Sequence, residues 1–244
     1  MSHLQSFAKV LPVLLVIGLG AALRRFKVLS EGTAQELKKL VVNITLPPLL
    51  FLAFARLDAQ VRYLGVVVVL FGACLAGFLV GKLLQPLTRI KAGTFPLLMT
   101  GFEAGMMGYA LYAAIYGAAN VHKIALMDLG HLIFVYAVLI PMLERGAGAR
   151  RSLGEQLRGI ARTPVLVAIA AGLIVGQSGL MTALGGFALA GGVADALALV
   201  GSLTAPLVAL LVGFDLKLEL RGLSRPALTV ALRLAFWIPV ALLI

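Results

Sequence analysis

A single carboxylate, Glu103, lies in an apolar stretch that is otherwise rich in glycine and methionine. The stretch runs from Phe102 to Gly117 and reads FEAGMMGYALYAAIYG. An unpaired carboxylate inside a bilayer costs about 2.5 to 3.5 kcal/mol, so it usually faces a cavity or a partner. A charged Glu103 would repel an anion, whereas a protonated one could donate a hydrogen bond to it. We therefore expect Glu103 to couple H⁺ or Na⁺ to anion binding; the alternative is a buried glutamate that a neighbouring polar side chain satisfies.

The glycines beside Glu103 predict that the helix is interrupted there. Gly101, Gly105 and Gly108 lower the helix propensity and leave little side-chain bulk, which favours an unwound segment or a close helix crossing. If the helix breaks near Gly105, the half-helix from about Gly108 to Gly117 starts with free N–H groups and a positive dipole end. A carboxylate substrate could bind there, at mid-membrane.

Other candidate residues are polar or helix-breaking positions in the apolar stretches. Together with Gly105 and Gly108, the candidates for the substrate path are Asn43, Thr45, Pro47, Pro48, Tyr109 and Tyr112. The prolines free backbone carbonyls and the tyrosines could line one face, although a tolerated kink and ordinary packing explain the same residues. Asp128 and His131 share one helix face, where they could shuttle protons or orient the partner of Glu103, or could form an outer interfacial pair held by water. Two such residues do not make a metal site, which needs three or four ligands.

The composition requires the elements that hold these residues to be membrane helices. Of the 244 residues, 61% are hydrophobic and 13% are charged, and the mean hydropathy is +1.04. Lipid offers no partner to backbone N–H and C=O groups, and the apolar runs are too long for barrel strands. We expect an all-α polytopic fold with eight spans, at about 7–23, 38–55, 62–81, 94–116, 124–143, 163–180, 194–214 and 223–244.

The basic residues predict the topology. The net charge is +11, and most lysines and arginines follow the first, third, fifth and seventh of the expected spans. The positive-inside rule therefore places the N-terminus outside, in a multi-pass protein of the cell membrane. This distribution explains the basic excess without a nucleic-acid partner. Arg233 remains inside the last span, where it could snorkel or balance an anion.

Two pairs of segments indicate a duplicated unit. The segment Pro12-Val-Leu-Leu-Val-Ile-Gly-Leu-Gly20 is similar to Pro164-Val-Leu-Val-Ala-Ile-Ala-Ala-Gly172, at an offset of 152 residues, and Pro48-Leu-Leu-Phe-Leu is similar to Pro206-Leu-Val-Ala-Leu, at an offset of 158. A unit of five spans would enter the membrane from opposite sides in its two copies, as inverted repeats do. Chance similarity between Leu- and Val-rich helices is the alternative. We expect a first repeat at 1–145 and an incomplete second one at 146–244, which lacks the last two of ten spans.

Several segments resemble the auxin efflux carrier family of membrane transport proteins. The segment Lys39-Leu-Val-Val-Asn-Ile-Thr-Leu-Pro-Pro-Leu-Leu-Phe51 is similar to the second span of that family, and 105–117 followed by 127–131 is similar to the fourth and fifth. The resemblance implies a homodimeric secondary transporter of organic anions such as auxin, malate or malonate. It also implies two inverted five-span repeats whose fourth and ninth spans are broken and cross at mid-membrane. Glu103 and Ala110 depart from the Asn and Pro that are typical of the broken span.

The function expected from these features is secondary active transport. A permease or efflux carrier would move small organic anions by alternating access at a mid-membrane site, without a cofactor. An intramembrane enzyme has little support, because the sequence has no HExxH motif, no G-x-S-x-G elbow and no nucleotide-binding glycine loop. Without an ATP-binding motif, the energy must come from an ion gradient or from the substrate gradient. The alternative function is that of a non-transporting or degenerate membrane paralogue with a regulatory role.

Overall fold

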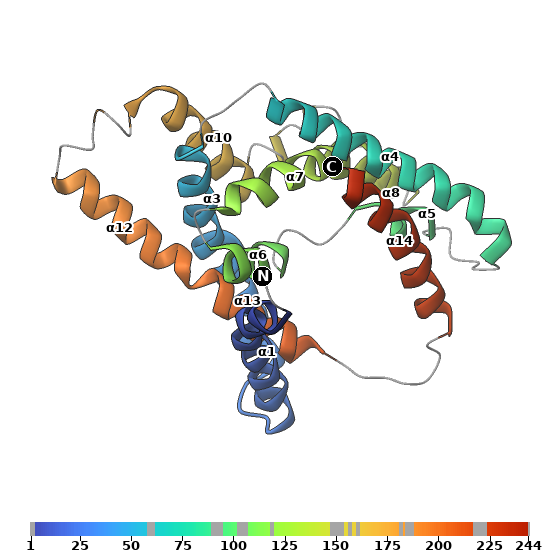
Figure 1. Cartoon of the computed structure of the whole chain (residues 1–244), viewed down its shortest axis with the longest axis horizontal. Coiled ribbons are helices and arrows are strands. Elements are labelled where there is room, and N and C mark those ends of the chain that lie inside the picture. The colour runs from blue at the N-terminus through green and yellow to red at the C-terminus, as the bar shows by residue number, and fades with distance from the viewer. Residues whose placement is uncertain are drawn as a thin grey trace. The chain divides into compact units, whose positions relative to one another are not determined.

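A computed structural model describes residues 3–57, 62–88, 95–101, 107–117, 120–146, 154–155, 158–159, 162–180, 183, 188–216 and 224–243. Within these residues every regular element is a helix, and none is a strand (Figure 1).

The helices follow the apolar stretches of the sequence closely. The first elements are α1 (His3–Arg25), α2 (Glu31–Leu40), a π-helical turn (Val41–Thr45), α3 (Leu46–Ala55), α4 (Arg62–Thr88), α5 (Phe95–Leu98) and α6 (Met107–Tyr116). They are followed by α7 (Val121–Phe134), a second π-helical turn (Val135–Leu139), α8 (Ile140–Gly146), α10 (Pro164–Gln177), α12 (Ala188–Ser202), α13 (Thr204–Asp215) and α14 (Ser224–Leu243).

Five helical stretches in the described part of the chain are long and apolar enough to cross a bilayer. They are Glu31–Ala55, Tyr63–Thr88, Val121–Glu144, Leu189–Asp215 and Pro226–Leu243, and Pro164–Gln177 is a shorter apolar helix. The five coincide with the second, third, fifth, seventh and eighth of the expected spans. The structure is therefore consistent with an all-α polytopic membrane protein.

The π-helical turn at Val41–Thr45 has a cause in the two prolines that follow it. Neither Pro47 nor Pro48 has an N–H, and in a regular α-helix each ring would clash with the carbonyl four residues earlier. The turn widens instead, and the Leu46 N–H donates to the carbonyl oxygen of Val41, five residues back. The wider turn lets α2 continue into α3 as one helical stretch despite the prolines.

The chain divides into two compact units, and each is described by itself. Unit 1 comprises Met1–Gln60, Glu103–Ala125 and Gly154–Leu216, and unit 2 comprises Val61–Phe102, Leu126–Leu153 and Lys217–Ile244. Unit 1 therefore contains α1, α2, α3, α6, α10, α12 and α13. Unit 2 contains α4, α5, α8, α14 and most of α7. Each unit combines segments from both halves of the chain.

In unit 1, α1 lies against α13 at a glycine (Figure 1). A Cβ atom added to Gly20 would overlap the carbonyl oxygen of Leu210 and lie 2.9 Å from the backbone nitrogen of Phe214. Apolar side chains gain little from leaving lipid for a neighbouring helix, so membrane helices associate by close packing at small residues. Gly20 therefore sets the distance between these two helices.

The contact of α10 with α3 in unit 1 has the same form. A Cβ atom added to Gly172 would lie 2.5 Å from the carbonyl oxygen of Phe51 and 3.2 Å from the backbone nitrogen of Ala55. Gly172 lies 152 residues after Gly20, which is the offset found in the sequence. The two crossings join the first with the seventh and the sixth with the second of the expected spans.

The backbone atoms that the two glycines meet are 159 residues apart in the chain. They belong to Phe51 and Leu210, and to Ala55 and Phe214. At this spacing Pro206 falls opposite Pro47, whereas the sequence comparison paired it with Pro48 at 158 residues.

In unit 2, aromatic residues pack α4 against α7. Cys74, Phe78 and Phe134 are buried together, and the rings of Phe71 and Phe134 meet edge to face at 6.2 Å. A Cβ atom added to Gly130 would overlap the backbone of α4. α7 therefore lies close against α4 over the segment that carries Asp128 and His131.

The first prediction concerns the glycine crossing of α1. Gly20→Ala should destabilise the protein by about 1 to 3 kcal/mol, because its methyl group has no room against α13. Gly18→Ala is the matched control on the same helix, since nothing lies within 4 Å of a Cβ at Gly18. Alanine there should be neutral or stabilising by up to about 1 kcal/mol. Unfolding in mixed detergent micelles measures both, and equal effects at the two positions would contradict the packing.

Candidate functional site

The fourth expected span is interrupted, and the first side of the interruption lies in unit 2. α5 ends at Leu98, and the chain then turns over Met99 and Thr100, where the Thr100 Oγ1 donates to the Leu97 carbonyl oxygen at 2.7 Å. Gly101 follows with φ +70°, in the left-handed region that favours glycine. The departure from helical geometry thus begins at 99–101, and Gly105, near which the sequence predicted a break, lies outside the described residues.

The second side of the interruption is the half-helix α6 in unit 1. It runs from Met107 to Tyr116, close to the expected 108–117. Gly108 lies at its start and is half-buried. Glu103 and Gly105, on which the expected ion-coupling and anion-binding roles depend, lie outside the described residues.

Asp128 and His131 of α7 are paired directly and lie beside the interruption. The His131 Nδ1 is 3.1 Å from the Asp128 Oδ1, and the side chains are 18% and 3% exposed, respectively. The other ring nitrogen of His131 faces Gly101, where an added Cβ atom would overlap the ring. The predicted pair is thus joined by direct contact. Its imidazole lies against Gly101, the residue of positive φ at the interruption.

Thr45, a candidate for the substrate path, is part of a buried contact in unit 1. Its hydroxyl accepts a hydrogen bond from the Thr204 hydroxyl at 3.0 Å and points its own proton toward the Val41 carbonyl oxygen at 3.4 Å. Thr45 is 1% exposed and Thr204 is fully buried. The hydroxyl group of Thr45 therefore joins the start of α3 to the start of α13.

The other candidates around Thr45 have different surroundings. Asn43 is exposed, and its amide nitrogen donates to the carbonyl oxygen of Lys39 at 2.8 Å. Pro47 and Pro48 are half-buried in the first turn of α3. Asn43 and Thr45 lie in the π-helical turn, and Pro47 and Pro48 follow it. This turn is the irregularity that corresponds to the tolerated kink, one of the two interpretations of the prolines.

The tyrosines of α6 divide between core and surface. Tyr109 is fully buried, on a helix that packs against α1 and α13. Tyr112 is half-buried, and its ring lies 4.6 Å from that of Tyr116, which is exposed. Tyr109 therefore contributes to the packing of unit 1, and Tyr112 is the more accessible of the two candidates.

Arg233 and Trp237 are site residues that the sequence analysis left unassigned. The Arg233 guanidinium donates to the carbonyl oxygens of Leu98 and Gly101, and the Trp237 Nε1 donates to that of Met99 at 3.2 Å. Both side chains reach the interruption from α14. The only signal in the sequence is the depth of Arg233 in an apolar run, because its partners are distant in the chain.

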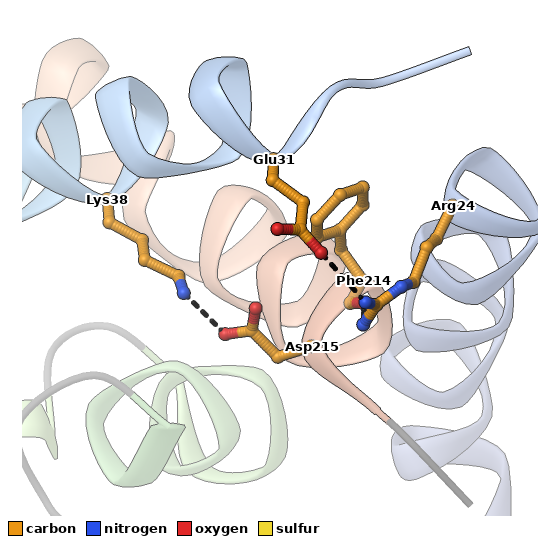
Figure 2. A network of polar contacts seen from close by, with 5 residues as sticks. All are labelled: Arg24, Glu31, Lys38, Phe214 and Asp215. Atoms are coloured by element: carbon orange, nitrogen blue, oxygen red, sulfur yellow. Dashed lines mark hydrogen bonds and ion pairs between the residues drawn. The ribbon is translucent and has the colours of Figure 1, made fainter. Parts of the chain in front are cut away.

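A polar network closes one end of unit 1 and includes Asp215. The Asp215 carboxylate is half exposed and pairs with the Lys38 ammonium at 2.6 Å. Arg24 donates to the Phe214 carbonyl oxygen at 3.0 Å and to the Glu31 carboxylate at 3.1 Å (Figure 2). The carboxyl ends of α1 and α13 and the amino-terminal half of the α2–α3 stretch therefore meet at the same end of the unit.

The candidate residues thus form two separate groups. Asn43, Thr45, Pro47, Pro48, Gly108, Tyr109 and Tyr112 belong to unit 1, and Asp128 and His131 belong to unit 2. Within unit 2 the structure brings a histidine, an arginine and a tryptophan to one interruption of the backbone. These side chains can donate hydrogen bonds to a ligand, and the arginine adds a positive charge.

Comparison with known proteins gives one informative relative. The chain is 27% identical over 168 residues to a protein of Methanocaldococcus jannaschii that is named an uncharacterized transporter. The similarity covers 65% of this chain and 53% of the relative, so the chain spans about half the length of that protein. No family model matches the chain. The similarity supports a role in transport in general, and together with the apolar helices it indicates an integral membrane protein.

The second prediction tests whether Thr45 is structural. Thr45→Val should destabilise the protein more than Thr204→Val, because it removes the acceptor of a buried hydroxyl group, whereas Thr45 keeps the Val41 carbonyl when Thr204 is replaced. Interhelical hydrogen bonds of this kind contribute about 0.6 to 1.7 kcal/mol. The double variant should lose less stability than the sum of the single losses. Strict additivity in detergent unfolding would show that the two hydroxyl groups do not interact.

The third prediction tests the contact between Gly101 and His131. Gly101→Ala should be more destabilising in the wild type than in a His131→Ala background, since the smaller side chain leaves room for the methyl group. Part of the loss, about 1 to 2 kcal/mol, should remain because alanine is strained at positive φ. Gly117→Ala is the control, since Gly117 has φ +86° and nothing within 4 Å of an added Cβ. Its effect should not depend on residue 131; the same penalty for Gly101→Ala in both backgrounds would refute the contact.

Proposed function

We propose that the chain is a secondary active transporter of small organic anions that works by alternating access. The observation that carries this proposal is the interruption at 99–101, which is lined by donors from two other helices of unit 2. Interrupted helices at mid-membrane are where secondary transporters bind ions and substrates. The relative named as a transporter supports the same class of function.

The paired contacts in unit 1 support an inverted repeat. One kind of helix crossing occurs twice, with its glycines 152 residues apart and the backbone atoms that they meet 159 residues apart. Thr45 and Thr204 are also 159 residues apart, and they contact each other. In an arrangement with two-fold symmetry, a residue meets its own equivalent only close to the axis. A pseudo-two-fold axis between the two threonines explains all three contacts, and it favours a duplicated frame over chance similarity.

The polar network at one end of unit 1 supports the proposed topology. It joins Arg24, Lys38 and Asp215, which lie in segments that the positive-inside rule places in the cytoplasm. An N-terminus outside the cell, a homodimer and the cell membrane as the location belong to the same proposal.

In the proposed transporter, Glu103 is the ion-coupling residue, and the start of α6 with Gly105 and Gly108 receives the anion. Asp128 and His131 act beside the interruption, where a histidine held by a carboxylate can exchange protons. Thr45 and Tyr109, both buried, act as packing residues of the frame. Asn43 and Tyr112 remain candidates for the substrate path, because neither is buried.

The fourth prediction tests transport and its coupling. Purified protein in proteoliposomes should take up radiolabelled dicarboxylates saturably, with a rate that depends on pH or on Na⁺. Glu103→Gln should abolish that ion dependence, because the amide cannot bind the proton or sodium ion. Glu36→Gln is the matched control, since Glu36 is exposed and paired with Lys39. Unchanged coupling in Glu103→Gln would exclude the assigned role, and no flux from folded wild-type protein would favour a non-transporting paralogue.

A further inference from the structure

We infer that Arg233 is an anion-binding residue, whose guanidinium receives a carboxylate group of the transported substrate at the interruption beside α5. The inference rests on the proposed function for the identity of the ligand as substrate. The site itself rests on three observations about α14: the depth of Arg233, the direction in which it donates, and the charge that it brings.

Arg233 lies too far from both ends of α14 for a surface role. Nine residues of the helix precede it and ten follow it, which corresponds to about 14 Å of helix on either side. The neighbouring residues Leu232, Leu234 and Ala235 are apolar. An arginine at such a depth is expensive in lipid and normally faces a protein partner or an aqueous cavity.

The side chain is committed to the interruption and does not snorkel toward water. Its Nη1 and Nη2 atoms donate to the carbonyl oxygens of Leu98 and Gly101. Trp237, one turn later on the same face of α14, donates to the carbonyl oxygen between them, that of Met99. Leu98 is the last residue of α5, and Met99 and Gly101 lie beyond that helix. The carbonyls at the end of a helix have no partner within it, and α14 donates to all three of these and holds the backbone in its turned conformation.

The carbonyl contacts leave donors and charge on the guanidinium. An arginine has five N–H donors, and these contacts use two of its terminal nitrogens. Carbonyl oxygens carry no net charge, so these contacts leave the guanidinium without a counter-ion. Within the described residues, no carboxylate lies within ion-pair distance of Arg233; the ion pairs found there join other residues. A planar guanidinium with unused donors matches a carboxylate ligand.

Because of the position of Arg233, binding of the carboxylate would affect the backbone of the interruption. The carboxylate would bind to the same group that holds 98–101 in place, so binding and the conformation of the interruption are linked through one side chain. His131, which lies against Gly101, contacts the same turn from α7. Arg233 is thus both a binding residue and a positioning residue for the interruption.

The chain contains a built-in reporter for the test. Trp237 is its single tryptophan, and it lies one helical turn from Arg233. In purified full-length chain in detergent, Trp237 fluorescence is titrated with acetate, succinate and benzoate, each beside its neutral amide. We expect a saturable change with at least one carboxylate and none with the corresponding amide. No saturable response to any carboxylate would overturn the inference.

Two variants of Arg233 and one control assign the response. Arg233→Lys keeps the charge but loses the planar pair of donors, so the Kd should rise about tenfold. Arg233→Gln removes the charge, and the Kd should rise about 100-fold or more. Arg162→Gln removes an exposed positive charge in unit 1 and should leave the Kd unchanged. An unchanged Kd in Arg233→Gln would overturn the inference. If the glutamine variant does not fold, the lysine variant decides in the same way.

The competing possibility is that Glu103 is the permanent counter-ion of Arg233. In that case Arg233→Gln would lose stability, and Arg233→Gln combined with Glu103→Gln would recover it; that recovery would overturn the inference. Flux measurements separate the inference from the proposed function. Carboxylate binding at Arg233 without flux would support the binding site and refute the proposed transport function. Flux with an unchanged KM in Arg233→Gln would support transport and refute the binding site.

Discussion

The irregular segments at 41–45 and 98–101 are governed by one constraint: inside a bilayer, a backbone group that leaves the helical ladder must find a partner within the protein. At 98–101 the partners are side chains of α14, together with the hydroxyl of Thr100. At Val41–Thr45 the backbone solves the problem by widening its own turn. Polar side chains in the apolar stretches are therefore found mainly where the helix is interrupted, and the same side chains are the ones able to meet a ligand.

The close packing of unit 1 answers a different requirement of the membrane. Apolar side chains gain little when they leave lipid for a neighbouring helix. Membrane helices are therefore held together by close backbone packing and by a few buried hydrogen bonds. Gly20, Gly172 and the threonine pair provide these contacts. These contacts fix the distances between the helices of unit 1.

The sequence predicted the features that depend on neighbours along the chain. Long apolar runs predicted the helices, two prolines predicted the kink in the second span, and a spacing of three predicted that Asp128 and His131 would share a helix face. Features that depend on distant residues could not be predicted. Arg233 and its carbonyl partners are separated by 132 and 135 residues. The pairing of Asp215 with Lys38 likewise joins two helix ends that only the fold brings together.

Several glycines near Glu103 favour an interruption, and helix propensity alone does not choose among them. The donors from α14 and the ring of His131 account for the departure from helical geometry at Gly101. The repeat and its offset stay predictions. The roles expected of Glu103 and Gly105 stay predictions, since these residues lie outside the described part of the chain.

The widened turn at Val41–Thr45 sets the rotation of α2 relative to α3 about their common helix axis. An α-helix turns by about 100° per residue, so a π-helical turn accommodates one residue without passing that rotation on to the helix that follows. If the same residues were wound as a regular α-helix, that rotation would appear between α2 and α3, and their faces would turn relative to each other by about that angle. Ala34 and Val41, which now pack with Val208 and Leu211 of α13, would then no longer share a direction with the buried side of α3. The number of residues per turn in this segment thus decides which side of α2 packs against α13.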